Sequence, residues 1–196
     1  MRSKAYVLIF DGLADWEPAL ATCEIGKSGK LEVVGVGFSK ETVVTMGGFR
    51  ICPDIALEDV DVDEAALFIL PGGEMWEGGG SAEVRELLGR LRSKDVPVAA
   101  ICGATLEVVR AGLTHGVKHT SNVLGYLKAV LPEYADGDFY EDRPAVADGN
   151  LITASGLGSV EFAYEIVKLL RIFNDEEAGE LYEMFKHGVI PARYMA

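Results

Sequence analysis

The chain has 196 residues, of which 49% are hydrophobic and 25% charged, a composition typical of a globular domain and not of a disordered chain. It carries 18 Lys and Arg residues against 31 Asp and Glu residues, and the resulting net charge of −13 argues against binding to nucleic acid or to an anionic membrane surface. No apolar run approaches the roughly 20 residues that cross a bilayer, and no signal-peptide cleavage site follows the short apolar start, so we expect a cytoplasmic protein.

Short apolar runs alternate with amphipathic stretches along the chain, a pattern typical of strands threaded through helices. The predicted strands are residues 5–10, 31–37, 66–70 and 97–101, with small hairpins at 42–52 and 145–154. The predicted helices are residues 16–27, a helix capped by Ser81, 103–111, 122–131 and 159–171. This order favours one α/β sandwich with a mostly parallel sheet.

The helix at residues 159–171 is expected to turn Val160, Ala163, Val167 and Leu170 toward the core. Residues beyond 174 are acidic and then mixed in character. We expect them to form a peripheral helix and a tail.

One of the three cysteines stands where chemistry is expected. Cys23, Cys52 and Cys102 are odd in number and form no close pair, which argues against a disulfide framework. Cys102 follows a buried strand and precedes a helix, so a tight turn would expose its thiol at the sheet edge, and the helix start would lower the thiol pKa. The alternative is that Cys102 is a small buried apolar residue, as most free cysteines are.

Two further loops are expected to meet Cys102, because ligands bind beyond the carboxyl ends of parallel strands. The first contains Glu17, which either complements the dipole of its helix or shares a proton with Cys102. The second contains Gly72 and Gly73, whose N–H groups could hold an oxyanion together with that of Gly103, or which simply form a turn.

No motif for a metal or a nucleotide is complete. The alternating acids Asp59, Asp61 and Asp63 lack the glycine and the final glutamate of a calcium loop, and no cysteine and histidine spacing fits zinc. The glycine-rich stretches lack phosphate-binding spacing. We therefore expect no cofactor.

Four motifs in order, DGLADWE, LPGG, AAICGAT and DGNLITASGLGSVEFAYEIVKLL, resemble the ThiJ/PfpI superfamily of the class I glutamine-amidotransferase-like fold. The resemblance covers residues 1–171 and leaves residues 172–196 as a peripheral helix and tail. It implies a flavodoxin-like three-layer α/β sandwich, Cys102 as a reactive thiol and Glu17 as its hydrogen-bond partner. It also implies an oxyanion site from the Gly73 and Gly103 backbones, and a homodimer or larger homo-oligomer.

One departure from the family pattern concerns histidine. Protease-like members carry a histidine directly after the cysteine, where this chain has Gly103. Members related to the parkinsonism protein carry a histidine at a position that aligns with Asn122, and His119 should point away from the site. The segment is similar to a bacterial subgroup labelled glutamine-amidotransferase-like. Asn122 orients a substrate or an oxyanion but accepts no proton.

The sequence therefore supports three hypotheses. The first is a cysteine-dependent hydrolase, amidase or glyoxalase-type enzyme acting on small carbonyl, amide or peptide-like substrates. The second is a non-catalytic, redox-responsive stress protein that senses oxidation at Cys102. The third is a protein whose fold is retained for an interaction and whose site is vestigial. Specificity is expected from side chains over the cleft, namely Trp16, Glu74, Met75, Trp76 and Asn122.

Overall fold

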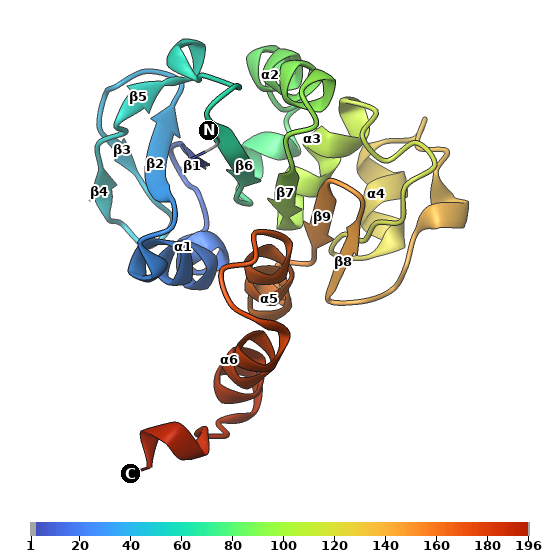
Figure 1. Cartoon of the computed structure of the whole chain (residues 1–196). Coiled ribbons are helices and arrows are strands. Elements are labelled where there is room, and N and C mark those ends of the chain that lie inside the picture. Colours follow the sequence, from blue (N-terminus) through green and yellow to red (C-terminus); the bar gives the residue numbers. More distant parts are fainter. Residues whose placement is uncertain (1–2, 196) are drawn as a thin grey trace.

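The computed structural model describes residues 3–195 and contains a seven-stranded sheet with helices on both faces (Figure 1). In spatial order the strands are β5 (Ile55–Ala56), β2 (Glu32–Gly37), β1 (Lys4–Ile9), β6 (Ala65–Leu70), β7 (Val98–Ile101), β9 (Leu151–Ala154) and β8 (Ala145–Asp148). All neighbours pair in parallel except β8, which pairs antiparallel with β9. The expected three-layer, mostly parallel fold is confirmed.

The helices form the two outer layers. On one face α1 (Trp16–Ser28) packs against α5 (Ser159–Leu169), and on the other α2 (Ala82–Ser93) packs against α3 (Thr105–Arg110), with α4 (Leu124–Val130) on that side of the molecule (Figure 1). The last helix, α6 (Asp175–His187), packs on α5 outside these layers. No helix within residues 3–195 has both the length and the apolar character needed to span a membrane.

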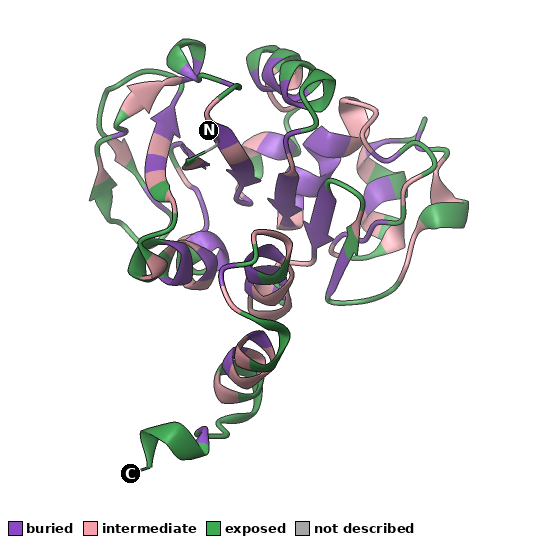
Figure 2. Ribbon diagram, viewed as in Figure 1, coloured by how far each residue is buried: buried purple, intermediate pink, exposed green. Residues whose placement is uncertain are grey.

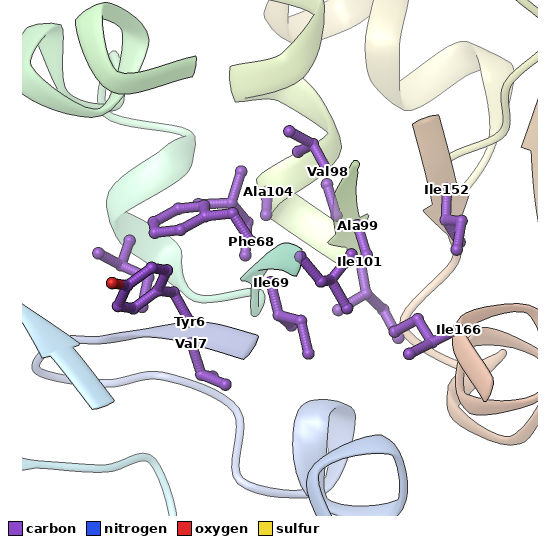
Figure 3. Close-up of a cluster of buried hydrophobic side chains, with 14 of the residues drawn as sticks. Tyr6, Val7, Phe68, Ile69, Val98, Ala99, Ile101, Ala104, Ile152 and Ile166 are labelled. Carbon is purple, nitrogen blue, oxygen red and sulfur yellow. The ribbon is translucent and has the colours of Figure 1, made fainter. Parts of the chain in front are cut away.

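The central strands are largely buried (Figure 2), and alternate side chains along them point to opposite layers of the core (Figure 3). Tyr6 and Phe68 extend from one face of β1 and β6, whereas Val7 and Ile69 extend from the other (Figure 3). Burial on both faces explains why these strands read as continuous apolar runs in the sequence.

Most predicted elements are confirmed, and the Ser81 cap accepts a hydrogen bond from the Val84 N–H at 3.3 Å. The hairpin predicted at residues 42–52 is the two-stranded sheet of β3 (Val43–Val44) and β4 (Arg50–Ile51). Strand β5 was not predicted, because two residues carry no detectable periodicity. Helix α4 begins two residues later than expected, since Val123 is still extended.

The predicted inward face of α5 is partly wrong. Ala163 and Val167 are buried as expected, but Val160 and Leu170 are only half-buried. Phe162 and Ile166 complete the buried face. Because α5 packs against the sheet, α1 and α6, its apolar surface is wide, and periodicity alone does not locate its centre.

Candidate active site

Cys102 occupies a strained turn at the carboxyl end of β7. Its φ of 59° lies in the left-handed region, which residues other than glycine rarely adopt. The residue begins a 3₁₀ turn, Cys102–Ala104, that leads directly into α3. The expected strand-to-helix turn is therefore confirmed, and it leaves a half-buried thiol at the edge of the sheet.

Glu17, in the first turn of α1, is a fully buried carboxyl group beside this thiol. Its Oε2 accepts a hydrogen bond from the Gly72 N–H at 2.5 Å. Its Oε1 is buried and accepts no hydrogen bond from any group within residues 3–195, although the carboxyl group lies beside the Cys102 thiol, which lowers the pKa of Glu17. Burial raises the pKa of Glu17 to about 7, outweighing the Gly72 N–H and the thiol, which both favour the carboxylate.

The two acids are coupled. Burial raises the pKa of the Cys102 thiol and the charge of Glu17 raises it further, whereas the Asn122 amide and the Gly103 N–H favour the thiolate. The N–H group of Gly103, at the start of the following turn and helix, lowers the thiol pKa as expected, but burial and the carboxylate outweigh it, so the net pKa of the thiol is raised. Two anions in contact cannot both form at little cost, so the thiol stays protonated near neutral pH while Glu17 titrates at about 7.

Asn122 forms the third side of the site. Its Nδ2 donates to Cys102 Sγ at 3.4 Å, and its Oδ1 accepts from the Gly156 N–H at 2.9 Å. The carbonyl of Gly156 in turn accepts from Trp16 Nε1 at 3.2 Å, and the Trp16 side chain is half exposed. One short segment after β9 therefore connects Asn122 and Trp16 around the sulfur.

Gly156 is a part of the site that sequence reasoning missed. A Cβ placed on it would lie 3.0 Å from Cys102 Sγ and 3.2 Å from Glu17 Oε1, so a side chain here would press on both groups. Its position in the sequence does indicate a place in the site, because Gly156 follows β9 as Cys102 follows β7, at the same edge of the sheet.

Close packing requires glycine at two further positions. A Cβ on Gly72 would lie 2.6 Å from Glu17 Oε2 and 2.7 Å from Cys102 Cβ. A Cβ on Gly103 would lie 3.1 Å from the carbonyl oxygen of Gly73. The backbones of the loops after β6 and β7 therefore pack closely against each other, and Gly73 and Gly103 lie side by side as expected.

Trp76 does not line the open side of the site. Its side chain is fully buried, its Nε1 donates to the Pro71 carbonyl at 2.8 Å, and its ring meets Phe10 edge to face at 5.5 Å. This corrects the expectation that Trp76 contacts a substrate, because the turn Glu74–Trp76 points it inward. Glu74, from the same turn, is exposed.

A buried ion cluster fixes this loop onto α3. Glu107, fully buried, pairs with Arg85 at 2.9 Å and with Arg110 at 3.3 Å. Arg110 also donates to the Trp76 carbonyl at 2.8 Å. The helix that follows Cys102 therefore holds the loop that carries Gly73.

The histidines lie elsewhere. His119 is buried, with Nε2 2.6 Å from the Tyr134 hydroxyl and Nδ1 2.7 Å from the Val117 carbonyl, so its expected orientation away from the site is confirmed. His115 pairs with Asp136 at 2.9 Å on the surface. Within residues 3–195, no group of three or more His, Cys, Asp or Glu side chains is arranged to hold a metal ion.

The sequence model of the DJ-1/PfpI family matches residues 3–169. The chain belongs to this family. An uncharacterized protease of Bacillus subtilis, YoaZ, is 37% identical over 93% of this chain and 90% of its own length. The crystal structure of a thiJ/pfpI family protein from Bacillus anthracis superposes with a TM-score of 0.90 at 38% identity, covering 95% of this chain and 92% of the other.

More distant DJ-1/PfpI relatives carry other functional names. A protein of Thermococcus kodakarensis named a deglycase is 30% identical over 86% of this chain and 99% of its own length. A protein of Caenorhabditis elegans named a glutathione-independent glyoxalase is 29% identical over 86% of this chain and 89% of its own length. These three relatives are therefore named for three different reactions: proteolysis, deglycation and the glyoxalase reaction.

Proposed function

We propose that this protein is a cysteine-dependent enzyme acting on small carbonyl or amide compounds, with Cys102 as nucleophile and Glu17 as general base and acid. The observation that carries the proposal is the contact between a strained, half-buried thiol and a buried carboxyl group whose pKa is about 7. A proton carrier is most effective when its pKa lies near the working pH. Glu17 therefore supplies the proton chemistry that a histidine supplies in other thiol enzymes.

The first step is addition of the thiol to a carbonyl group. Sγ bonds to the carbonyl carbon, the electron pair of the C=O π bond moves to oxygen, and the thiol proton passes to the Glu17 carboxylate. The N–H groups of Gly73 and Gly103 stabilise the oxyanion. Glu17 then returns the proton to that oxygen or, in an amide, to the departing nitrogen.

Replacing the nucleophile tests this proposal. We expect Cys102→Ala to reduce turnover of a small 2-oxoaldehyde or a small amide by roughly a thousandfold or more, because the covalent step is lost. Cys23→Ala and Cys52→Ala are the controls, since both of these thiols are exposed and outside the site. Activity retained in Cys102→Ala would contradict the proposal.

A redox-sensing role is the second candidate, and the donors around the sulfur favour it. Asn122 Nδ2, the Gly103 N–H and a protonated Glu17 would each stabilise a sulfinate formed on Cys102. The raised thiol pKa works against this role, because peroxide reacts with the thiolate.

Intact-mass and peptide analysis after mild peroxide treatment distinguishes the two roles. We expect Cys102 to oxidise no faster than Cys23 or Cys52, since burial and Glu17 keep its sulfur protonated. Selective conversion of Cys102 to sulfinate would instead support the redox-sensing role and count against a thiol that stays protonated until it acts in catalysis.

A further inference from the structure

Two buried hydroxyl groups are bonded to the turn at Cys102, and the proposed reaction does not use them. Thr105, the first residue of α3, donates from Oγ1 to the carbonyl oxygen of Cys102 at 2.6 Å. The same Oγ1 lies 2.6 Å from the Ser121 hydroxyl oxygen. Thr105 and Ser121 are each 1% exposed, so bulk water does not compete for these hydrogen bonds.

The number of available hydrogens determines the direction of this chain of hydrogen bonds. A hydroxyl group carries one hydrogen, and Thr105 donates its own to the Cys102 carbonyl. The Ser121 hydroxyl is therefore the donor in the second bond. The chain runs from Ser121 through Thr105 to the carbonyl, and successive hydrogen bonds in such a chain strengthen each other.

A hydroxyl bonded to the carbonyl three residues earlier is a common local motif, but two features distinguish this one. The carbonyl belongs to Cys102, whose φ of 59° is costly and persists only where its surroundings restrain it. The second hydroxyl comes from a separate segment, since Ser121 lies 16 residues further along the chain. The strained turn is therefore restrained from outside α3 as well as from within it.

The segment that contains Ser121 is itself firmly held. The preceding residue, Thr120, donates from its N–H to Thr153 Oγ1 of β9 and from its Oγ1 to the Arg143 carbonyl, both at 2.8 Å. The following residue, Asn122, donates to the sulfur of the reactive cysteine at 3.4 Å. One short segment thus holds that cysteine at two points, its carbonyl through Ser121 and its sulfur through Asn122.

We propose that Thr105 and Ser121 are positioning residues that set the reactivity of the Cys102 thiol. By fixing the carbonyl of the strained turn, they hold the sulfur beside Glu17 and Asn122. Without the two hydroxyl groups, the turn relaxes and the sulfur moves away from both neighbours. This claim concerns the thiol itself and applies equally to a nucleophile and to a redox sensor; only its effect on turnover rests on the proposed function.

Alkylation by iodoacetamide at pH 8 tests the claim without turnover. Sγ bonds to the methylene carbon of the reagent, iodide leaves and the thiol proton passes to the solvent. The protein carries Cys23→Ser and Cys52→Ser, so that Cys102 is the one thiol of the chain. Thr105→Val removes the hydroxyl and keeps the shape of the side chain, whereas Thr105→Ser keeps the hydroxyl.

We expect Thr105→Val to be alkylated about two- to tenfold faster than the wild type, the range that corresponds to the loss of one hydrogen bond. The thiolate is the reacting form, and a sulfur that has moved away is less affected by burial and by Glu17, which raise the thiol pKa. Thr105→Ser should restore the wild-type rate to within about twofold. For a substrate that the enzyme turns over, Thr105→Val should lower kcat by a similar factor and leave KM unchanged.

A double variant separates positioning from a general loss of stability. Thr105→Val leaves the buried Ser121 hydroxyl without its acceptor and should destabilise the protein. Adding Ser121→Ala removes this unpaired donor, so most of the lost stability should return in urea unfolding. The alkylation rate should stay raised, because the bond to the Cys102 carbonyl is still missing.

The matched control is Thr114→Val. Thr114 is fully buried and donates to Asp136 Oδ2 at 2.7 Å, away from the cysteine, so its loss should lower stability and leave the alkylation rate unchanged. The inference is overturned by an unchanged rate in Thr105→Val, by an equal rise in Thr114→Val, or by a rate in the double variant that returns to the wild-type value together with stability.

The proposed function is scored separately. A raised alkylation rate in Thr105→Val, in a protein whose wild type turns over no carbonyl or amide compound, removes the proposed function and leaves the positioning role standing. Turnover by the wild type, with an alkylation rate that Thr105→Val does not change, removes the positioning role alone.

Discussion

Glu17→Gln is expected to lower kcat/KM by roughly two to four orders of magnitude while leaving the fold intact, because the amide keeps the shape of the side chain but carries no proton. In the wild-type protein the carboxylate is the active base, so kcat/KM should rise as pH increases through about 7, and this rise should be absent in the variant. Glu24→Gln, which neutralises another buried carboxyl group of α1, is the matched control. A variant with wild-type activity and pH profile would contradict the assignment of Glu17.

The same substitution should stabilise the protein at neutral and alkaline pH. The pKa of Glu17 in the folded state lies above its unfolded value, so its ionisation costs no stability below about pH 4.5 and progressively more as pH rises through about 7. The difference between the folded and unfolded pKa values of Glu17 corresponds to about 3 kcal/mol of unfolding free energy once the group is fully ionised. Glutamine does not ionise and therefore removes this cost. Urea unfolding of the wild type and of Glu17→Gln at pH 5 and pH 8.5 measures this difference in unfolding free energy. A stabilisation of the variant that does not increase with pH would contradict the account.

Glu107→Ala is expected to have the opposite effect on stability, although Glu107 is equally buried. Its carboxylate pairs with Arg85 and Arg110 and accepts from the Ser81 N–H at 3.2 Å. Its removal leaves the two guanidinium groups without their shared partner, and the loss should be about 3 to 5 kcal/mol. Glu107→Gln should lose less, since burial raises the pKa of Glu107 despite both arginines and the amide keeps some hydrogen bonds.

Thermal unfolding at pH 7 measures this loss. With a shift of about 2–4 °C per kcal/mol for a chain of this length, Glu107→Ala should unfold at least roughly 6 °C below the wild type. Exposed Glu83, in the first turn of α2, provides the control substitution Glu83→Ala. A Tm for Glu107→Ala equal to that of this control would mean that the cluster contributes nothing to the fold.

The sequence predicts those site residues that directly follow the end of a strand. Apolar runs identify β1, β6 and β7, and the rule that parallel strands present their carboxyl ends at one edge brings Glu17, Gly73 and Cys102 together. The four ordered motifs add the family, which the match over residues 3–169 confirms.

Other features depend on packing that no local pattern encodes. Trp76 follows directly after the loop, but only the turn Glu74–Trp76 determines that its ring points inward. The hydrogen bond between Ser121 and Thr105 joins two segments with no shared motif. The raised pKa of Cys102 is a balance of burial and the charge of Glu17 against two hydrogen-bond donors, and the sequence does not show how deeply the thiol is buried.

The central claim is that Glu17 carries a proton near neutral pH beside Cys102. The most direct test is a pH titration of the full chain labelled with ¹³C at the glutamate carboxyl groups, followed by NMR, with the Glu17 signal identified by its absence in Glu17→Gln. The account predicts a midpoint near 7 for this signal. A midpoint near 4.3, the ordinary value for glutamate, would contradict it.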